Sequence, residues 1–302
     1  MNYSFESIAS EEYLKLSEKL LSLAKDPETQ EKMRLILYEG QCGSFKTDNK
    51  LHIRSNSFWE GQKRISYAYM LATHPETFDL LAENNIDLFH GTASNALPHI
   101  LKYGLQSVNT QVKRGSYPEG VEAWSRIAGG RDFISFTNVL NVALDYVEMN
   151  VDHPFAKHGT FGTVIGINSE ALSPTKRCYV KSDVPEVGIV DELPLENFGV
   201  ILVPESKVKF VQKLIGNLNI SVGACDIDDR FFNFDKYDES IYIDEEKFEQ
   251  IQNRPKKESH IFAHHSLKEL TESRKISDLF NLRKLFKNIN KGKEHENSRD
   301  NI

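Results

Sequence analysis

Cysteine is scarce in this sequence: the 302 residues include three, Cys42, Cys178 and Cys225, and none belongs to a CxxC pair. An odd and widely spaced set of this kind argues against a disulfide framework and against a thiolate zinc site. A reducing compartment fits this cysteine usage best.

Long apolar runs and an excess of basic charge are also missing. No apolar stretch approaches the roughly 20 residues that a membrane-spanning helix needs, so we expect a soluble protein without stable membrane insertion. The first residues lack the basic and then apolar pattern of a secretory signal, so no classical export signal is expected. The net charge of −7 argues against a general nucleic-acid binder, which usually needs a basic face for the phosphates.

The composition that is present suits a globular protein, with 39% hydrophobic and 27% charged residues. The length allows a sizeable core and predicts one catalytic domain with extensions, or two domains. We expect a helical N-terminal region over residues 1–85 and a catalytic core over 86–215. A C-terminal extension is expected over 216–302, with a helix near 266–288 and a disordered end.

Residues 1–85 carry the signals of helices. Apolar residues recur at three- and four-residue spacing over 10–25 and 28–38, and Gly40 is placed to end the second segment in a left-handed cap. A capping box begins the predicted helix 57–73, and a first-turn proline begins the predicted helix 75–84. We expect these helices to bury one face on the domain that follows.

Short β-branched and aromatic segments dominate the middle of the chain and predict strands. The predicted strands are Asp87–Thr92, Phe133–Thr137, Thr163–Ile167, Cys178–Lys181, Glu186–Val190, Phe198–Val203 and Val208–Gln212. Two helices, Ser94–Tyr103 and Asn138–Glu148, interrupt them. Strands outnumber helices too strongly for regular βαβ alternation, so the fold class is expected to be α+β.

Three of these segments place polar side chains where a ligand could meet them. Leu88-Phe89-His90-Gly91-Thr92 delivers a histidine from a strand, next to a glycine that permits close approach of a ligand. The strand Phe133-Ile134-Ser135-Phe136-Thr137 carries small hydroxyls on one face, and the helix after it returns Tyr146. Glu186 begins a third strand that is otherwise apolar. Each pattern alone also fits an ordinary strand end, but their order and spacing favour a functional interpretation.

Together the three segments resemble the ADP-ribosyltransferase superfamily over roughly residues 87–213. His90-Gly91-Thr92 and the tail Ile100-Leu101-Lys102-Tyr103-Gly104-Leu105 are similar to the diphtheria-toxin and poly(ADP-ribose) polymerase class. The Ser135 strand is similar to the Ser-Thr-Ser strand of the cholera-toxin class, or to the Tyr-Phe strand of the polymerase class with Ser135 in the tyrosine position. In either register Ala143 and Tyr146 match the downstream A-x-x-Y.

The third segment resembles the catalytic-glutamate strand of the family. Glu186 is followed by Leu193-Pro194 and by Phe198-Gly199 at the spacing found there. The resemblance implies a split antiparallel β-sheet core that uses NAD⁺ as co-substrate and no metal ion. It also implies cleavage of the nicotinamide–ribose bond by a mono-ADP-ribosyltransferase.

The resemblance further implies a role for each matching residue. Glu186, His90 and Ser135 would be catalytic: Glu186 would bind the nicotinamide ribose and stabilise its oxocarbenium ion, Ser135 would support Glu186, and His90 would bind the adenosine ribose. The Gly91 backbone would hold the nicotinamide amide, and Thr92 would line the ribose. The nicotinamide ring would pack on Tyr146 or Phe136. The residues expected to bind NAD⁺ are His90, Gly91, Thr92, Phe136, Thr137 and Tyr146.

The acceptor of ADP-ribose is expected to be a protein. Arginine-modifying members of the family usually have Glu or Gln where this chain has Val184, which argues against an arginine acceptor. The alternatives are an NAD⁺ glycohydrolase with water as acceptor, and an inactive binding module, which Val184 and Ser135 would permit. An RNA 2′-phosphotransferase would need basic and histidine residues that the core lacks.

The extensions and the Asn, Lys and Ile usage suggest a bacterial effector delivered into the host cytosol.

Overall fold

The computed structural model describes residues 5–42, 45–46, 57–114, 133–151, 160–173, 176–179, 185–226, 232–234 and 241–243. The chain forms two compact units, residues 1–216 with 220–263, and residues 217–219 with 264–302. Every helix and strand described below belongs to the first unit. The predicted helix near 266–288, the predicted disordered end and Val184 lie outside the described residues.

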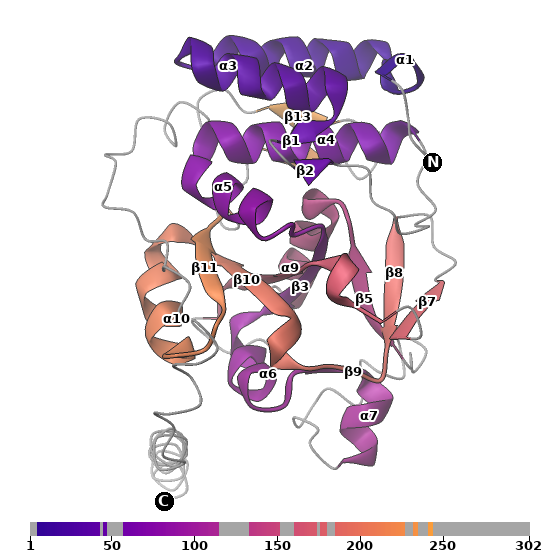
Figure 1. The fold of residues 1–302 in the computed structure, drawn as a ribbon, viewed down its shortest axis with the longest axis vertical. Helices are drawn as coiled ribbons and strands as arrows, with labels where there is room; N and C mark the ends of the chain where they lie inside the picture. The colour runs from indigo at the N-terminus through magenta and orange to yellow at the C-terminus, as the bar shows by residue number, and fades with distance from the viewer. Residues whose placement is uncertain are drawn as a thin grey trace, which may run out of the picture. The chain divides into compact units, whose positions relative to one another are not determined.

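The N-terminal part is helical, as the spacing of its apolar residues predicts (Figure 1). Ser10 caps α2 by accepting a hydrogen bond from the backbone of Tyr13, and Asp26 caps α3 in the same way. Gly40 has a φ of 67° and ends the segment in the predicted left-handed cap. The elements are α1 (Phe5–Ile8), α2 (Glu11–Leu23), α3 (Pro27–Arg34), the π-helical turn η1 (Leu35–Glu39), α4 (Ser57–Thr73) and α5 (Pro75–Glu83).

A seven-stranded sheet forms the centre of this unit. Its order is β11 (Ser221–Ala224), β10 (Phe198–Val203), β6 (Gly162–Ile167), β3 (Leu88–Ala93), β5 (Phe133–Thr137), β8 (Glu186–Val190) and β7 (Arg177–Tyr179). All neighbouring strands are antiparallel except β10 and β11, which are parallel. The mostly antiparallel sheet with separate helices confirms the α+β class.

Smaller elements complete the described residues. Two-stranded ladders join β1 (Gln41–Cys42) to β2 (Phe45–Lys46), β4 (Leu105–Gln106) to β9 (Glu192–Leu193), and β12 (Phe232–Phe234) to β13 (Ile241–Ile243). The remaining helices are α6 (Leu97–Tyr103), α7 (Val108–Lys113), α9 (Leu140–Val151) and α10 (Val208–Ile215). Short 3₁₀ turns are η2 (Ser94–Ala96), η3 (Ser169–Ala171), η5 (Leu195–Asn197) and η6 (Glu205–Lys207).

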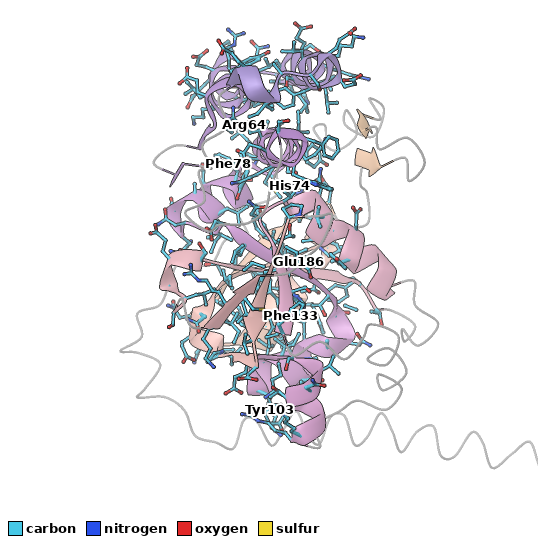
Figure 2. All side chains as sticks on the ribbon, turned by 90° about the vertical axis from the view of Figure 1, so that its right-hand side faces the viewer. Arg64, His74, Phe78, Tyr103, Phe133 and Glu186 are labelled. Carbon is cyan, nitrogen blue, oxygen red and sulfur yellow. The ribbon has the colours of Figure 1, made fainter. Side chains whose placement is uncertain are left out.

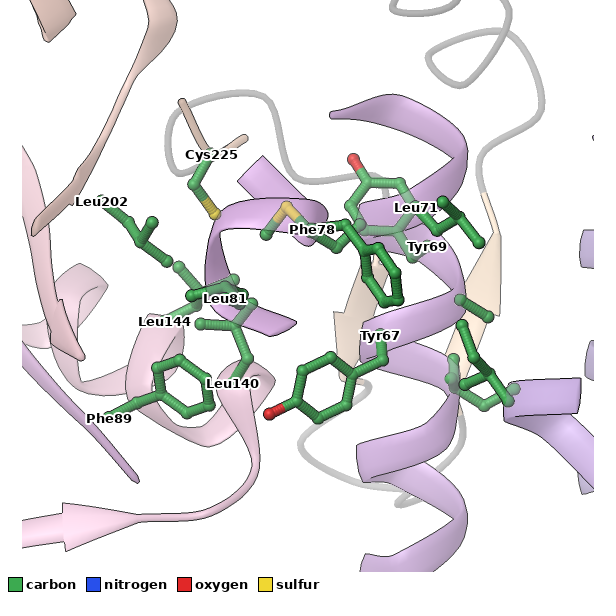
Figure 3. Packing of buried hydrophobic residues seen from close by; sticks show 14 of the residues in the cluster. Tyr67, Tyr69, Leu71, Phe78, Leu81, Phe89, Leu140, Leu144, Leu202 and Cys225 are labelled. Atoms are coloured by element: carbon green, nitrogen blue, oxygen red, sulfur yellow. The ribbon is translucent and has the colours of Figure 1, made fainter. Parts of the chain in front are cut away.

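One hydrophobic core joins the N-terminal helices to the sheet. Helices α4, α5 and α9 pack on β3, β6 and β10, and the shared cluster includes Tyr67, Phe78, Leu81, Phe89, Leu140, Leu144 and Leu202 (Figure 3). Ile165 and Ile201 are equally buried but lie outside this cluster, because successive strand residues face opposite sides of the sheet. Burial of each large apolar side chain contributes about 1.5–3 kcal/mol, so these contacts hold the helical layer on the sheet.

The predicted strand Val208–Gln212 is wrong, because these residues begin helix α10. Val208, Val211 and Ile215 recur at helical spacing and are buried, whereas Phe210 is 58% exposed. Five residues that alternate between basic and apolar fit both the period of 2 of a strand and the period of 3.6 of a helix. The apolar spacing continues to Ile215, and over this longer segment it fits a helix. Strand β11, which was not predicted, is short and contains Gly223, so its β signal is weak.

Candidate active site

Ser135 lies on strand β5 and Glu186 on the neighbouring antiparallel strand β8. Glu186 is labelled in Figure 2. Thr137 lies opposite Glu186 and Ser135 lies opposite Gly188, so the side chains of Ser135 and Glu186 share one face of the sheet. The Ser135 hydroxyl donates a hydrogen bond to Oε1 of Glu186. The Glu186 side chain is 5% exposed, and a carboxylate so deeply buried is uncommon unless hydrogen bonds hold it. The sheet therefore fixes one carboxylate in a defined orientation.

His90 reaches the same serine from strand β3. Its Nδ1 atom lies 2.8 Å from the carbonyl oxygen of Ser135. A carbonyl oxygen can only accept, so Nδ1 carries the proton, and Nε2 of the neutral ring is left as an acceptor. Burial lowers the pKa of His90, while its hydrogen bond to Ser135 acts in the opposite direction. The ring is therefore neutral at pH 7 and suited to accept a hydrogen bond from a hydroxyl group.

The pairing of β3 with β5 is interrupted at this point. Within the two strands, Phe89 and Thr137 form the single bridged pair, whereas β3 stays paired with β6 from Leu88 to Ala93. The hydrogen bond from His90 to Ser135 lies just beyond the bridged pair. The His90 side chain thus makes the hydrogen bond to β5 at the point where the backbone pairing of the two strands ends.

Ser135 connects the other two residues that the sequence predicts to be catalytic, His90 and Glu186. Its carbonyl oxygen accepts from His90 and its hydroxyl donates to Glu186. The Glu186 carboxylate and the neutral His90 imidazole are both hydrogen-bond acceptors, and each is joined to Ser135. The register places the Glu186 side chain on the face of Phe89, whereas the His90 ring lies with Phe136 toward the other face. The fixed negative charge of Glu186 suits a reaction in which a sugar becomes positive.

Gly91 is required by helix packing. A Cβ atom at this position would overlap the carbonyl oxygen of Ala143 and would lie 3.1 Å from Val147, both on α9. Close contact between β3 and α9 therefore demands a glycine at this position. The expectation that the same glycine permits close approach of a ligand stays a prediction. The role of the Gly91 backbone in binding nicotinamide stays a prediction.

Two of the predicted NAD⁺-binding side chains lie in the interior. Phe136 is 1% exposed, and its ring centroid lies 5.4 Å from that of His90. Thr137 is 3% exposed, and its hydroxyl accepts from the backbone of Val139 just before α9. Thr92 and Tyr146 are partly exposed. Of the two aromatic rings predicted to pack on nicotinamide, Tyr146 is thus the one with accessible surface.

Two further side chains on the Glu186 face of the sheet were not predicted from the sequence. Phe133 lies two residues from Ser135 on the same face of β5, and Cys178 on β7 lies opposite Gly188. Burial raises the pKa of the Cys178 thiol, and the negative charge of Glu186 raises it further. The alternation of side chains along β5 could have indicated that Phe133 shares the face of Ser135. The position of Cys178 on this face follows only from the pairing of β7 with β8.

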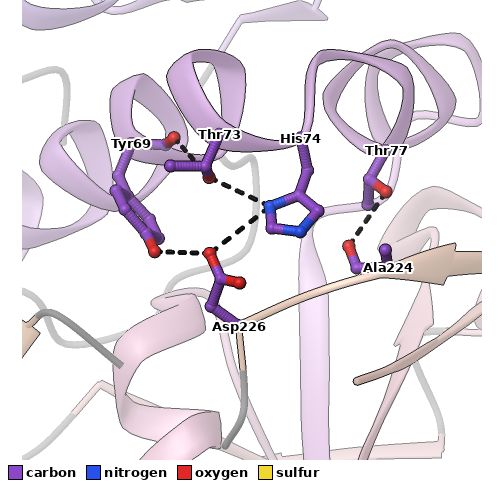
Figure 4. A network of polar contacts seen from close by, with 6 residues as sticks. All are labelled: Tyr69, Thr73, His74, Thr77, Ala224 and Asp226. Carbon is purple, nitrogen blue, oxygen red and sulfur yellow. Dashed lines mark hydrogen bonds and ion pairs between the residues drawn. The ribbon is translucent and has the colours of Figure 1, made fainter. Parts of the chain in front are cut away.

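A second buried polar network lies between the helices and the end of the sheet (Figure 4). The Tyr69 hydroxyl donates to Asp226 at 2.5 Å, and His74 Nδ1 lies 3.5 Å from the same carboxylate oxygen. The Thr77 hydroxyl donates to the carbonyl of Ala224 at 2.9 Å. Burial raises the pKa of Tyr69 well above its usual value, and the charge of Asp226 adds to this. These contacts fasten the end of β11 to α4 and α5, so we assign the network a structural role.

No protein-family model and no curated protein sequence matches this chain. In the part of the chain that the structure describes, no group of three or more His, Cys, Asp or Glu side chains is placed to hold a metal ion. The helices within those same ranges are all too short or too polar to cross a membrane.

Proposed function

We propose that this protein is a mono-ADP-ribosyltransferase that cleaves the nicotinamide–ribose bond of NAD⁺ and transfers ADP-ribose to a protein. One observation carries this proposal: Ser135 orients the buried carboxylate of Glu186 and is itself joined to His90. The order and spacing of the three residues along the chain, which resemble those of ADP-ribosyltransferases, support it.

Glu186 would act at the step in which nicotinamide leaves. Breaking the bond between the ribose and the nicotinamide nitrogen develops positive charge on the sugar, as in glycoside hydrolysis. A preorganised charge in a site of low dielectric contributes about 3–4 kcal/mol to such a transition state. The hydrogen bond from Ser135 keeps the carboxylate in place, so little reorganisation is needed when the charge develops.

His90 would bind the other ribose of NAD⁺. Its Nε2 atom is an acceptor because Nδ1 donates to Ser135, and a ribose hydroxyl is a suitable donor. Thr92 follows two residues later on β3 and shares the face of His90, so it would line the same part of the ligand. Tyr146 would pack on the nicotinamide ring. A bacterial effector delivered into a host cell is the biological setting that we infer.

The test uses purified protein and NAD⁺ labelled in its adenylate part, with and without eukaryotic cell lysate. Glu186→Gln removes the charge while keeping the shape, and Glu196→Gln, an exposed position, is the matched control. A labelled lysate protein that Glu186→Gln abolishes and Glu196→Gln retains supports the transferase. Release of nicotinamide and free ADP-ribose without labelled protein would establish a glycohydrolase instead. Measurable NAD⁺ binding without any turnover would leave a binding module.

A further inference from the structure

The face of the sheet that carries Glu186 also carries a cysteine. On β8, Glu186 and Gly188 are two residues apart and therefore point to the same side. Cys178 on β7 lies directly opposite Gly188, which places its side chain diagonally next to that of Glu186. The part of the sheet nearest the carboxylate thus includes a thiol from the next strand.

The absence of a side chain at Gly188 brings this sulfur close to the strand. A Cβ atom built at position 188 would overlap the Cys178 sulfur and would lie 2.8 Å from the Phe133 ring. The sulfur and the ring therefore fill the volume above Gly188 from opposite sides. Together they form a wall over Gly188 on the face of the sheet that carries Glu186, and we call it the Cys178–Phe133 wall.

The electrostatics agree with this placement. The negative charge of Glu186 contributes to the raised pKa of the Cys178 thiol, after the larger effect of burial. The two groups are therefore close enough for their charges to interact. The Cys178 side chain is partly exposed, so small reagents can reach it, whereas Cys225 is 2% exposed. The wall is uncharged at neutral pH, because the thiol keeps its proton.

We propose that Cys178 is a specificity-determining residue of the Glu186 site, where its size limits which acceptor group can approach the ribose held by Glu186. This inference rests on the proposed function. Because Cys178 is diagonal to Glu186, a larger group at position 178 would occupy more of the volume next to the carboxylate than the sulfur does. Residue 178 would accordingly affect the transfer step more than the binding of NAD⁺.

Size at position 178 is tested by Cys178→Ala, Cys178→Phe and carbamidomethylation with iodoacetamide. We expect the adduct and Cys178→Phe to reduce transfer about tenfold or more, because small displacements at a reacting centre are costly. The apparent dissociation constant of NAD⁺ should change much less. Cys178→Ala treated with iodoacetamide should transfer ADP-ribose at the same rate as untreated Cys178→Ala. Peptide mass spectrometry identifies which cysteine is modified; full transfer by protein completely modified at Cys178 would overturn the proposal.

A second measurement does not depend on turnover. Glu186→Gln should speed the alkylation of Cys178 severalfold at pH 7.5, because removing the carboxylate charge lowers the pKa of the thiol. Glu196→Gln should leave that rate unchanged. An unchanged rate in Glu186→Gln would show that the two side chains are not adjacent, and the inference would fail whether or not NAD⁺ is cleaved. Faster alkylation in a protein that never releases nicotinamide would reject the proposed function and leave the adjacency standing.

Discussion

The Nδ1 atom of His90 lies 2.8 Å from the carbonyl oxygen of Ser135, beyond the position at which strands β3 and β5 stop pairing. Because this bond fixes the proton on Nδ1, it also determines what Nε2 can do. The same serine orients Glu186 through its hydroxyl. One small residue thus sets the geometry of both groups that we propose to contact the riboses of NAD⁺.

Replacing the carboxylate of Glu186 is expected to affect catalysis far more than folding. Glu186→Gln retains an acceptor for the Ser135 hydroxyl but removes the charge that would stabilise the oxocarbenium ion. We expect kcat for nicotinamide release to fall about 100- to 1,000-fold, the range seen when one preorganised electrostatic group is lost. Nicotinamide release under saturating NAD⁺ measures this, and thermal unfolding of the same samples reports on folding. Near wild-type turnover by a folded variant would remove Glu186 from the mechanism.

Ser135→Ala should weaken both the orientation of Glu186 and the fold. Without the hydroxyl, the buried carboxylate loses one donor, which costs about 1–3 kcal/mol in the free energy of unfolding. Misplacement of the carboxylate should reduce kcat about 10- to 100-fold. Denaturant titrations and nicotinamide release give the two values. The exposed Ser22→Ala is the matched control and should change neither. Equal effects from both serines would contradict the positioning role.

His90 should make stability dependent on pH in a defined direction. Its pKa is lowered in the folded state, so the unfolded chain binds the proton more readily. The stability that neutral His90 contributes is then present above the unfolded pKa of about 6.5 and is lost as the pH falls below it. His90→Asn, which keeps a donor for Ser135, should lose less stability than the wild type between pH 7.5 and 5.0. Urea titrations at the two pH values measure the difference. If His90→Asn and the wild type lost the same free energy of unfolding between the two pH values, a group other than His90 would be responsible.

The strands of the candidate site could be predicted because their signals are local. Phe133–Thr137, Glu186–Val190 and Phe198–Val203 have the predicted bounds, since each is a β-branched and aromatic run between turn residues. A local signal also predicted the left-handed cap at Gly40. Long-range pairing is different: Ser135 and Glu186 are 51 residues apart, and their contact depends on the register of β5 and β8.

Two features around the candidate site depend on packing between distant segments. Gly91 matches a ligand-binding motif, yet its missing side chain is explained by the carbonyl of Ala143 on α9. The position of Cys178 diagonally next to Glu186 follows from the pairing of β7 with β8, which the sequence does not show. Val208–Gln212 was assigned to a strand because a short window does not separate a period of 2 from one of 3.6.

The contact between Gly91 and α9 predicts a steric effect. Gly91→Ala would force its methyl group against the Ala143 carbonyl, so α9 must shift, and Tyr146 on that helix with it. We expect a loss of about 1–3 kcal/mol in the free energy of unfolding, as for overpacked cores. The control is Ser22→Ala at an exposed position of helix α2, which should stay within about 0.5 kcal/mol of the wild type. A larger loss in the control than in Gly91→Ala would contradict this account.

The network around Asp226 should support folding without contributing to chemistry. Tyr69→Phe removes the hydroxyl that donates to Asp226 at 2.5 Å, leaving a buried carboxylate with one donor fewer. The expected loss is about 1–3 kcal/mol in the free energy of unfolding, with nicotinamide release per folded molecule unchanged. Tyr103→Phe, at a residue that is 41% exposed, is the matched control and should stay within about 0.5 kcal/mol of the wild type. Denaturant titrations at pH 7 compare the two variants. A loss of turnover in folded Tyr69→Phe would instead tie this network to the site around Glu186, since the core that contains Tyr69 also contains Phe89 of strand β3.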